Sequence, residues 1–140
     1  MIKTLAPIAL AATAALALSA PSAARDSATP TAEMSKGEAK LAKLLEGRVA
    51  EKPQSCVRLF PSRNLQIIDE TALVYGRGNV IYVNVPRNAE DLDDSDAILT
   101  RPSGNSLCRS DQVTTFDRHV GFYTGNIFLS DFVPYRRVDS

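Results

Sequence analysis

Hydrophobic residues follow three different patterns along this chain. Residues 5–18 form an uncharged run rich in Ala and Leu, and residues 34–45 place apolar side chains at helical spacing. After residue 52 the sequence breaks into short β-branched and aromatic runs that are separated by Gly, Pro and Asp. Because side chains on helices and on strands repeat with different periods, the last two patterns predict one short helix followed by a β-rich region.

The first run has the layout of a secretory signal peptide. Lys3 supplies a positive charge before it, and small residues at 19–24 follow it and end at a predicted cut between Ala24 and Arg25. A membrane span needs about twenty apolar residues, and this run is shorter. We therefore expect cleavage after Ala24 and export to the periplasm or the extracellular space, with no integral membrane segment left in the mature chain.

The second pattern predicts an amphipathic helix behind a polar, disordered spacer at residues 25–34. Ser35 and Glu38 match a capping box, in which a hydroxyl and a carboxylate satisfy N–H groups at the helix start. Leucines then repeat at helical spacing, and Gly47 is typical of a helix end. The pattern predicts a helix over residues 36–46 that opens a single domain, residues 35–140.

The strongest strand pattern is a hairpin in which residues 71–75 and 80–85 flank a glycine-rich turn. With a two-residue loop, Tyr75 would face Val80 and Leu73 would face Tyr82, and both faces of the hairpin would be partly apolar. We therefore expect this hairpin in the middle of a sheet, covered on both sides.

Further short strands are expected at residues 55–59, 65–68, 98–101, 113–117, 121–129 and 131–136. Strands of this length and spacing favour a mainly β fold, α+β by element count. We expect a single antiparallel sheet that is rolled into a small barrel or sandwich, with the short helix at its N-terminal side.

Composition removes several classes of function. The 140 residues contain 16 basic and 16 acidic side chains, so the formal net charge is zero. This balance gives no electrostatic footprint for nucleic acid or an anionic membrane. The sequence has no phosphate loop, dinucleotide fingerprint or cluster of metal-ligand residues. We expect no nucleic-acid partner, no cofactor and no metal.

Cys56 and Cys108 are the only cysteines. In an oxidising compartment an isolated pair favours one intramolecular disulfide, and closing so long a loop stabilises the folded state by roughly 4 kcal/mol. A reactive free thiol and an intermolecular disulfide are the alternatives. One histidine and two distant cysteines do not make a metal-ligand set.

Five carboxylates lie within residues 90–96, a density that suits a hard cation such as calcium. The run fails the EF-hand pattern, because Asp96 stands where Gly is required and Pro102 stands where a bidentate Glu is required. We favour a solvated loop in which Asp residues cap a short helical turn. A weak, irregular calcium site is the alternative.

His119 is the only histidine, so any Ser–His–Asp triad would have to use it. Asp117 is the only neighbour that could share its side of a strand, and no nucleophile elbow is present. A thiolate pair of Cys108 with His119 would be silenced by the disulfide. We favour a histidine on a solvent-exposed turn.

Arginine is the only cation from residue 53 onward. Arginine forms bidentate pairs with carboxylates better than lysine does. One interpretation is a surface that recognises anions. The interpretation that we favour is pairing with the 11 acidic residues of the same segment.

A set of short motifs stands in a characteristic order: Ser55-Cys56-Val57, Ile68-Asp69, Val80-Ile81-Tyr82-Val83-Asn84, Leu107-Cys108-Arg109-Ser110-Asp111 and Leu129-Ser130-Asp131-Phe132-Val133-Pro134-Tyr135. Over about residues 53–136 the chain resembles a family of small exported bacterial proteins whose function is not established. Members of that family often carry a further cysteine near the segment that corresponds to 128–132, where this chain has none. The resemblance implies an exported, compact β domain, leaves Cys56 and Cys108 to pair with each other, and implies no catalytic residue.

Two classes of function follow from the sequence. The first is a non-catalytic binding or structural module of the cell envelope, with an envelope protein or a small ligand as its partner. The alternative is a small hydrolase-like enzyme that uses His119 with a nearby Asp or Ser. A pocket that brings such groups to His119 would favour the enzyme. An inhibitor-like or chaperone-like surface would need an exposed apolar patch or an unpaired sheet edge.

Overall fold

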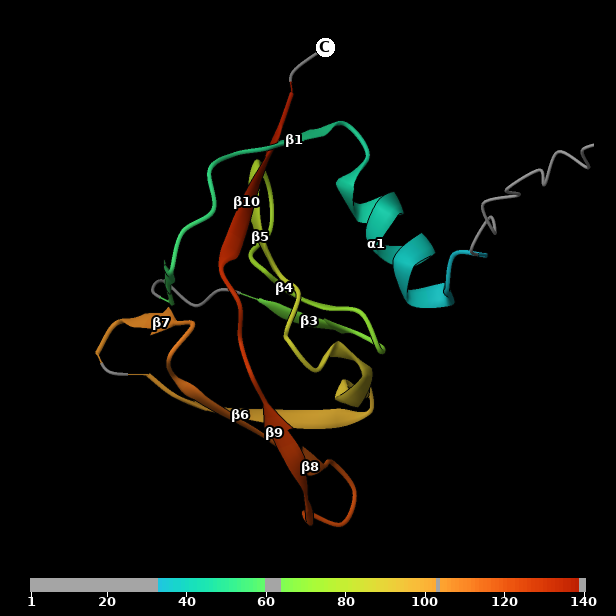
Figure 1. Cartoon of the computed structure of the whole chain (residues 1–140), viewed down its shortest axis with the longest axis vertical. Helices are drawn as coiled ribbons and strands as arrows, with labels where there is room; N and C mark the ends of the chain where they lie inside the picture. Colours follow the sequence, from blue (N-terminus) through green and yellow to red (C-terminus); the bar gives the residue numbers. More distant parts are fainter. Residues whose placement is uncertain (1–32, 60–63, 103, 139–140) are drawn as a thin grey trace, which may run out of the picture. The chain divides into compact units, whose positions relative to one another are not determined.

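The structure is a computed structural model, and it describes three segments of the chain: residues 33–59, 64–102 and 104–138 (Figure 1). The predicted signal peptide and its cut between Ala24 and Arg25 lie outside the described residues, as does most of the predicted spacer. None of the helices in the described segments has the length and apolarity needed to cross a membrane.

The helix α1 spans Lys36–Leu45 and confirms the capping-box prediction. The backbone N–H of Glu38 donates to Ser35 Oγ at 3.1 Å, and the backbone N–H of Ser35 donates to Glu38 Oε2 at 2.8 Å. Gly47 follows the helix with φ +67°, a left-handed conformation that glycine adopts without strain. Local residues alone therefore define both ends of this short helix.

The described residues contain ten strands: β1 (Arg48–Ala50), β2 (Cys56–Arg58), β3 (Leu65–Ile68), β4 (Ala72–Tyr75), β5 (Val80–Asn84), β6 (Asp96–Arg101), β7 (Ser106–Cys108), β8 (Gln112–Asp117), β9 (Tyr123–Ile127) and β10 (Phe132–Arg137). The mainly β prediction is confirmed, although the sequence did not predict β1 or β7. A 3₁₀ turn, η1 (Ala89–Asp91), lies between β5 and β6.

The predicted single sheet needs correction, because the strands form three antiparallel sheets and none of them closes into a barrel in the described part of the chain. Their strand orders are β1-β10-β5-β4-β3, β2-β7 and β6-β8-β9. The chain between β9 and β10 leaves the ladder at residues 128–131. There Ser130 is hydrogen-bonded to the side chain of Asn84 on both its N–H and its C=O, so this stretch adds no strand.

The central hairpin β4–β5 is confirmed, but its register differs from the prediction by two residues. Tyr75 pairs with Tyr82, and Leu73 pairs with Asn84. The loop is wider than two residues and has Gly76 and Gly78 at φ +98° and +86°, and the Arg48 guanidinium donates to the carbonyl oxygen of Gly78 at 2.8 Å. A shift of two residues keeps every side chain on its predicted face.

Both faces of the five-stranded sheet are buried. The cluster on one face contains Ile68, Ala72, Val74, Ile81 and Val83, and the leucines of α1 pack against it. The other cluster combines side chains from all three sheets with two loop leucines: Val57, Leu73, Tyr75, Leu92, Leu107, Val113, Ile127, Leu129 and Phe132. The two smaller sheets are thus held to the larger one by a shared core rather than by a continuous ladder.

A groove between two arginines beside the disulfide

The structure places His119 on an exposed turn after β8. The backbone N–H groups of His119 and Val120 donate to Asp117 Oδ1 at 2.7 and 2.9 Å. These bonds, that of Val120 first, hold the pKa of the Asp117 carboxyl below its usual value. The His119 imidazole makes no hydrogen bond to any described residue, and the carboxylate nearest in sequence is engaged by the turn itself.

The predicted disulfide is confirmed: Cys56 and Cys108 are bonded, and the described residues contain no free cysteine. The two residues lie directly opposite each other on β2 and β7, with their Cα atoms 4.0 Å apart. The bond closes a loop with a sequence separation of 52 residues. It joins two strands that have only three paired positions each, so it holds the smallest sheet together.

The disulfide also anchors the turn that follows Cys108. The Cys108 N–H donates to Asp111 Oδ2 at 2.7 Å, and the Asp111 N–H donates to the Cys108 carbonyl at 2.9 Å. The Arg109 N–H donates to the Ser55 carbonyl at 2.9 Å. The turn presents Arg109 and Ser110 at the surface, next to the covalent cross-link.

The segment 128–131 faces this turn and is fixed by asparagine side chains. Asn84, which is fully buried, donates to the Ser130 carbonyl at 2.7 Å and accepts from the Ser130 N–H at 3.1 Å. Asn88 accepts from the Phe128 N–H at 2.9 Å, and the Arg87 N–H donates to the Phe128 carbonyl at 2.9 Å. Buried polar groups that are satisfied in this way hold a loop as firmly as a short ladder does.

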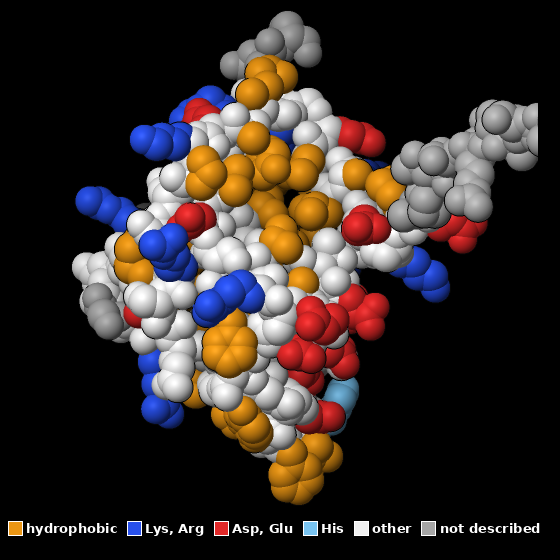
Figure 2. All heavy atoms as spheres, in the orientation of Figure 1, with side chains coloured by type: hydrophobic (Ala, Val, Ile, Leu, Met, Phe, Trp, Pro, Cys, Tyr) orange, Lys and Arg blue, Asp and Glu red, His pale blue; other side chains and the backbone are white. Residues whose placement is uncertain are grey.

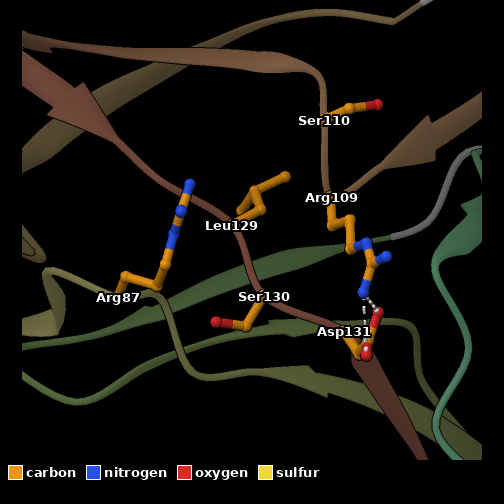
Figure 3. Close-up of a pocket in the computed structure, with 6 residues that line it drawn as sticks. All are labelled: Arg87, Arg109, Ser110, Leu129, Ser130 and Asp131. Atoms are coloured by element: carbon orange, nitrogen blue, oxygen red, sulfur yellow. Dashed lines mark hydrogen bonds and ion pairs between the residues drawn. The ribbon is translucent and has the colours of Figure 1, made fainter.

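Between the turn and this segment lies a hollow of about 430 Å³ (Figure 3). A second hollow of about 210 Å³ adjoins it and shares Arg87, Arg109, Ser110 and Leu129 with it. We call the two together the arginine groove and define it by Arg87, Arg109, Ser110, Phe128, Leu129, Ser130 and Asp131.

The polar groups of the arginine groove are only partly used by the chain. Arg109 Nη1 lies 3.0 and 3.3 Å from the two oxygens of Asp131, in a pair that is exposed on both sides. The Arg87 guanidinium lies 5.6 Å from the centre of the Phe128 ring and makes no hydrogen bond or ion pair to any described residue. The hydroxyls of the two groove serines likewise have no partner among the described residues.

A separate hollow, of about 510 Å³, is lined by carboxylates near η1. We call it the acidic hollow and define it by Asp69, Glu70, Glu90, Asp91, Asp93, Asp96 and Asp117. Figure 2 shows carboxylates gathered in one patch in the region of η1. The predicted acidic run thus meets acidic residues from two distant parts of the chain.

Much of the oxygen in the acidic hollow is committed to local structure. Asp93 accepts from the Ser95 hydroxyl at 2.6 Å and from the Ser95 N–H at 2.7 Å, and these bonds lower the pKa of Asp93. Asp96 is buried and accepts from the Thr124 hydroxyl. Asp91 accepts from the Asn88 side chain at 2.8 Å. The expected short helical turn is present as η1, but it has no side-chain cap at its start.

One group of acidic side chains has spacing that a cation could use. Oxygens of Asp69, Asp93 and Asp94 lie within 4.8 Å of one another, and all three residues are exposed. The Lys40 ammonium lies 3.7 Å from Asp94 and supplies part of the counter-charge. Exposed carboxylates that already have such a partner give no ground for assigning a metal.

Most of the arginine groove was not predicted from the sequence. Arg87 stands only in the arginine-rich segment, whereas Arg109 also belongs to the motif at residues 107–111; of the two, only Arg109 pairs with an acid. Ser110 and Ser130 stand in two separate motifs, at residues 107–111 and 129–135, and no pattern indicated that the motifs meet. The one available hint was Asn84, a polar residue at the end of a strongly apolar strand pattern, which indicates a buried hydrogen-bonding role.

Comparisons of this chain with protein-family models, with curated proteins and with solved structures give no match. The resemblance to small exported bacterial proteins therefore stays a prediction. The function has to be argued from the geometry of the arginine groove and from the sequence patterns that surround it.

Proposed function

We propose that this protein is an exported binding module of the bacterial cell envelope, which holds a ligand in the arginine groove without transforming it. The observation that carries the proposal is a groove whose two walls are fixed in advance while several of its polar groups stay unused. A preformed site binds without the entropic cost of ordering its own side chains and loops.

Both walls of the groove are supported from behind. The disulfide and the Asp111 turn fix the wall that carries Arg109 and Ser110. The side chain of Asn84 fixes the wall that carries Ser130. Neither the disulfide nor Asn84 lines the groove; Asp111 lines its smaller hollow, where its Oδ2 accepts from the Cys108 N–H.

Export is supported by the pattern of residues 1–24 and by the disulfide, since disulfides persist in oxidising compartments. The resemblance to exported bacterial proteins points the same way. The two sequence arguments agree with the cross-linked fold, and together they favour the periplasm or the extracellular space.

The hydrolase-like alternative gains no support from the position of His119. A general base needs a partner within hydrogen-bond reach and a substrate beside it. Here the imidazole is exposed and contacts no described Asp or Ser side chain by a hydrogen bond. Asp117 uses its Oδ1 to hold the turn that carries His119.

Export is tested by expressing the full chain in a Gram-negative host and sequencing the N-terminus of the protein recovered from each fraction. We expect the periplasmic or secreted protein to begin at Arg25. Recovery of protein that retains Met1 in the cytoplasm alone would contradict export.

Binding is tested by adding a small-molecule extract of bacterial envelopes to the purified protein and measuring the melting temperature. A ligand of the native fold raises it. Ser110→Trp fills the groove, and Asn105→Trp places the same bulk at an exposed position that does not line it. We expect a shift for wild type and Asn105→Trp that Ser110→Trp loses; equal shifts in all three proteins would contradict the proposal.

A further inference from the structure

We infer that the ligand of the arginine groove carries an oxyanion, either a carboxylate or a phosphate, next to a small apolar group. The inference rests on the proposed function, because it names the chemistry of the molecule that the groove would hold. It goes further in assigning a role to each group that lines the groove, and three features of the groove carry it.

The first feature is the set of unused donors. Arg87 offers guanidinium N–H groups that no described residue accepts, and Ser110 and Ser130 line the same hollow. A planar guanidinium matches the geometry of carboxylate and phosphate oxygens and binds them through two parallel hydrogen bonds. A neutral ligand would form no ion pair with Arg87, whereas an oxyanion would accept hydrogen bonds from its guanidinium and pair with its charge.

The second feature is the apolar surface beside these donors. Phe128 is 53% exposed, and its ring lies under the Arg87 guanidinium. Leu129 lines both hollows and lies between the two arginines in Figure 3. The smaller hollow also reaches Val113 and Ile127. A ligand that was only an oxyanion would leave this surface in water, whereas a small apolar group beside the oxyanion would cover it.

The third feature is a carboxylate that the protein itself places at the second arginine. Both oxygens of Asp131 lie within 3.3 Å of Arg109 Nη1, so Arg109 already binds an oxyanion in the unliganded groove. Asp131 therefore competes with a ligand for Arg109 and adds negative charge that repels it. Removing the charge of Asp131 while keeping its shape should strengthen binding, which a purely structural ion pair would not do.

The experiment titrates the purified full-length protein with three probes and measures binding by isothermal titration calorimetry. The probes are phenyl phosphate, phenylacetate and phenylacetamide. Phenylacetamide matches phenylacetate in shape and lacks its charge. We expect saturable binding of at least one anion and none of the amide over the same millimolar range. The stronger of the two anions tells whether the natural ligand is a phosphate or a carboxylate.

Three variants locate the binding. Arg87→Gln should weaken the anion by about tenfold, the value of one charge-assisted hydrogen bond. Asp131→Asn should strengthen it by about threefold, as expected for one exposed, screened charge. Arg101→Gln removes a comparable exposed charge that does not line the groove and should change nothing. All three should melt within a few degrees of wild type.

Failure of this inference can be told apart from failure of the proposed function. If phenylacetamide binds as well as phenylacetate, and Ser110→Trp abolishes both, the groove binds ligands but the oxyanion assignment is overturned. The inference would also be overturned if neither anion showed saturable binding, or if Arg87→Gln and Arg101→Gln weakened anion binding equally. The proposed function falls only if, in addition, the envelope extract shifts Ser110→Trp as much as wild type.

Discussion

The acidic hollow has seven carboxylate residues along its wall, whereas the arginine groove, which we propose as the binding site, has two arginines. In the acidic hollow, carboxylates accept hydrogen bonds from Asn88, Ser95, Thr124 and the turn N–H groups after Asp117. In the arginine groove, the Arg87 guanidinium and two serine hydroxyls make no hydrogen bond to a described residue. Four of the seven carboxylates of the acidic hollow are therefore engaged in local hydrogen bonds, whereas three donor side chains of the groove make no hydrogen bond to a described residue.

This difference shows why the density of charge along a sequence is a poor guide to a site. Residues 90–96 suggested a calcium site because five acids stand together, whereas Arg87 and Arg109 are 22 positions apart and share no motif. A site needs groups that the fold holds in place but does not satisfy. The supports of the groove, Asn84 and the disulfide, serve the first need without supplying the second.

The largest expected effect comes from removing the disulfide that supports one wall of the groove. The double variant Cys56→Ser/Cys108→Ser should lose about 4 kcal/mol of unfolding free energy, because the unfolded chain regains the freedom of a long loop. Urea unfolding measures it. Where the variant still folds, groove binding should weaken while the amide shifts of the Asp117 turn stay unchanged. Equal disturbance of both regions would remove the contrast between them.

The other wall depends on Asn84. Asn84→Ala leaves the partly buried N–H and C=O of Ser130 without their partners, and should cost about 3 kcal/mol and loosen segment 128–131. The control is Asn105→Ala, which changes an exposed asparagine that does not line the groove and should stay within about 0.5 kcal/mol of wild type. Chemical denaturation compares them, and a similar loss in both variants would refute the role of Asn84.

A destabilising substitution near the acidic hollow should not change anion binding in the arginine groove. The Cβ of Gly37→Ala would collide with Thr71 Oγ1 and the Asp69 carbonyl, so we expect a loss of about 2 kcal/mol from overpacking. Gly125→Ala is the matched control, since its Cβ would meet Thr115 Oγ1 at an ordinary 3.6 Å. Thermal unfolding gives the stabilities. Weaker anion binding in Gly37→Ala, beyond that of the control, would show that the two regions are coupled.

The smallest effect is the acid response of the turn that carries His119. Because the pKa of Asp117 is lowered in the fold, its contribution to stability is fully present above the ordinary Asp pKa and is lost as pH falls through the lowered value. An NMR titration should therefore show the Val120 amide shifting at a pH below the ordinary Asp range. Asp117→Asn should abolish this transition, and a midpoint at or above that range would contradict the assignment.

Local patterns in the sequence predicted the helix, the central hairpin and the faces of its side chains, since each depends on neighbours within a few residues. The Ser35–Glu38 capping box and the alternation around Tyr75 are examples. The division into three sheets and the groove depend on contacts such as Asn84 with Ser130, which are 46 positions apart. No periodicity reports such a contact. The disulfide was predictable despite its separation, because only two cysteines exist to pair.

Backbone NMR during a phenylacetate and phenyl phosphate titration tests the central claim most directly, because it reports on both hollows at once. We predict saturable shifts at Arg87, Arg109 and Ser110 and in segment 128–131, and unchanged amides around Asp69 and Asp93. Shifts that centre on the acidic hollow, or that scatter over the surface without saturating, would contradict the account.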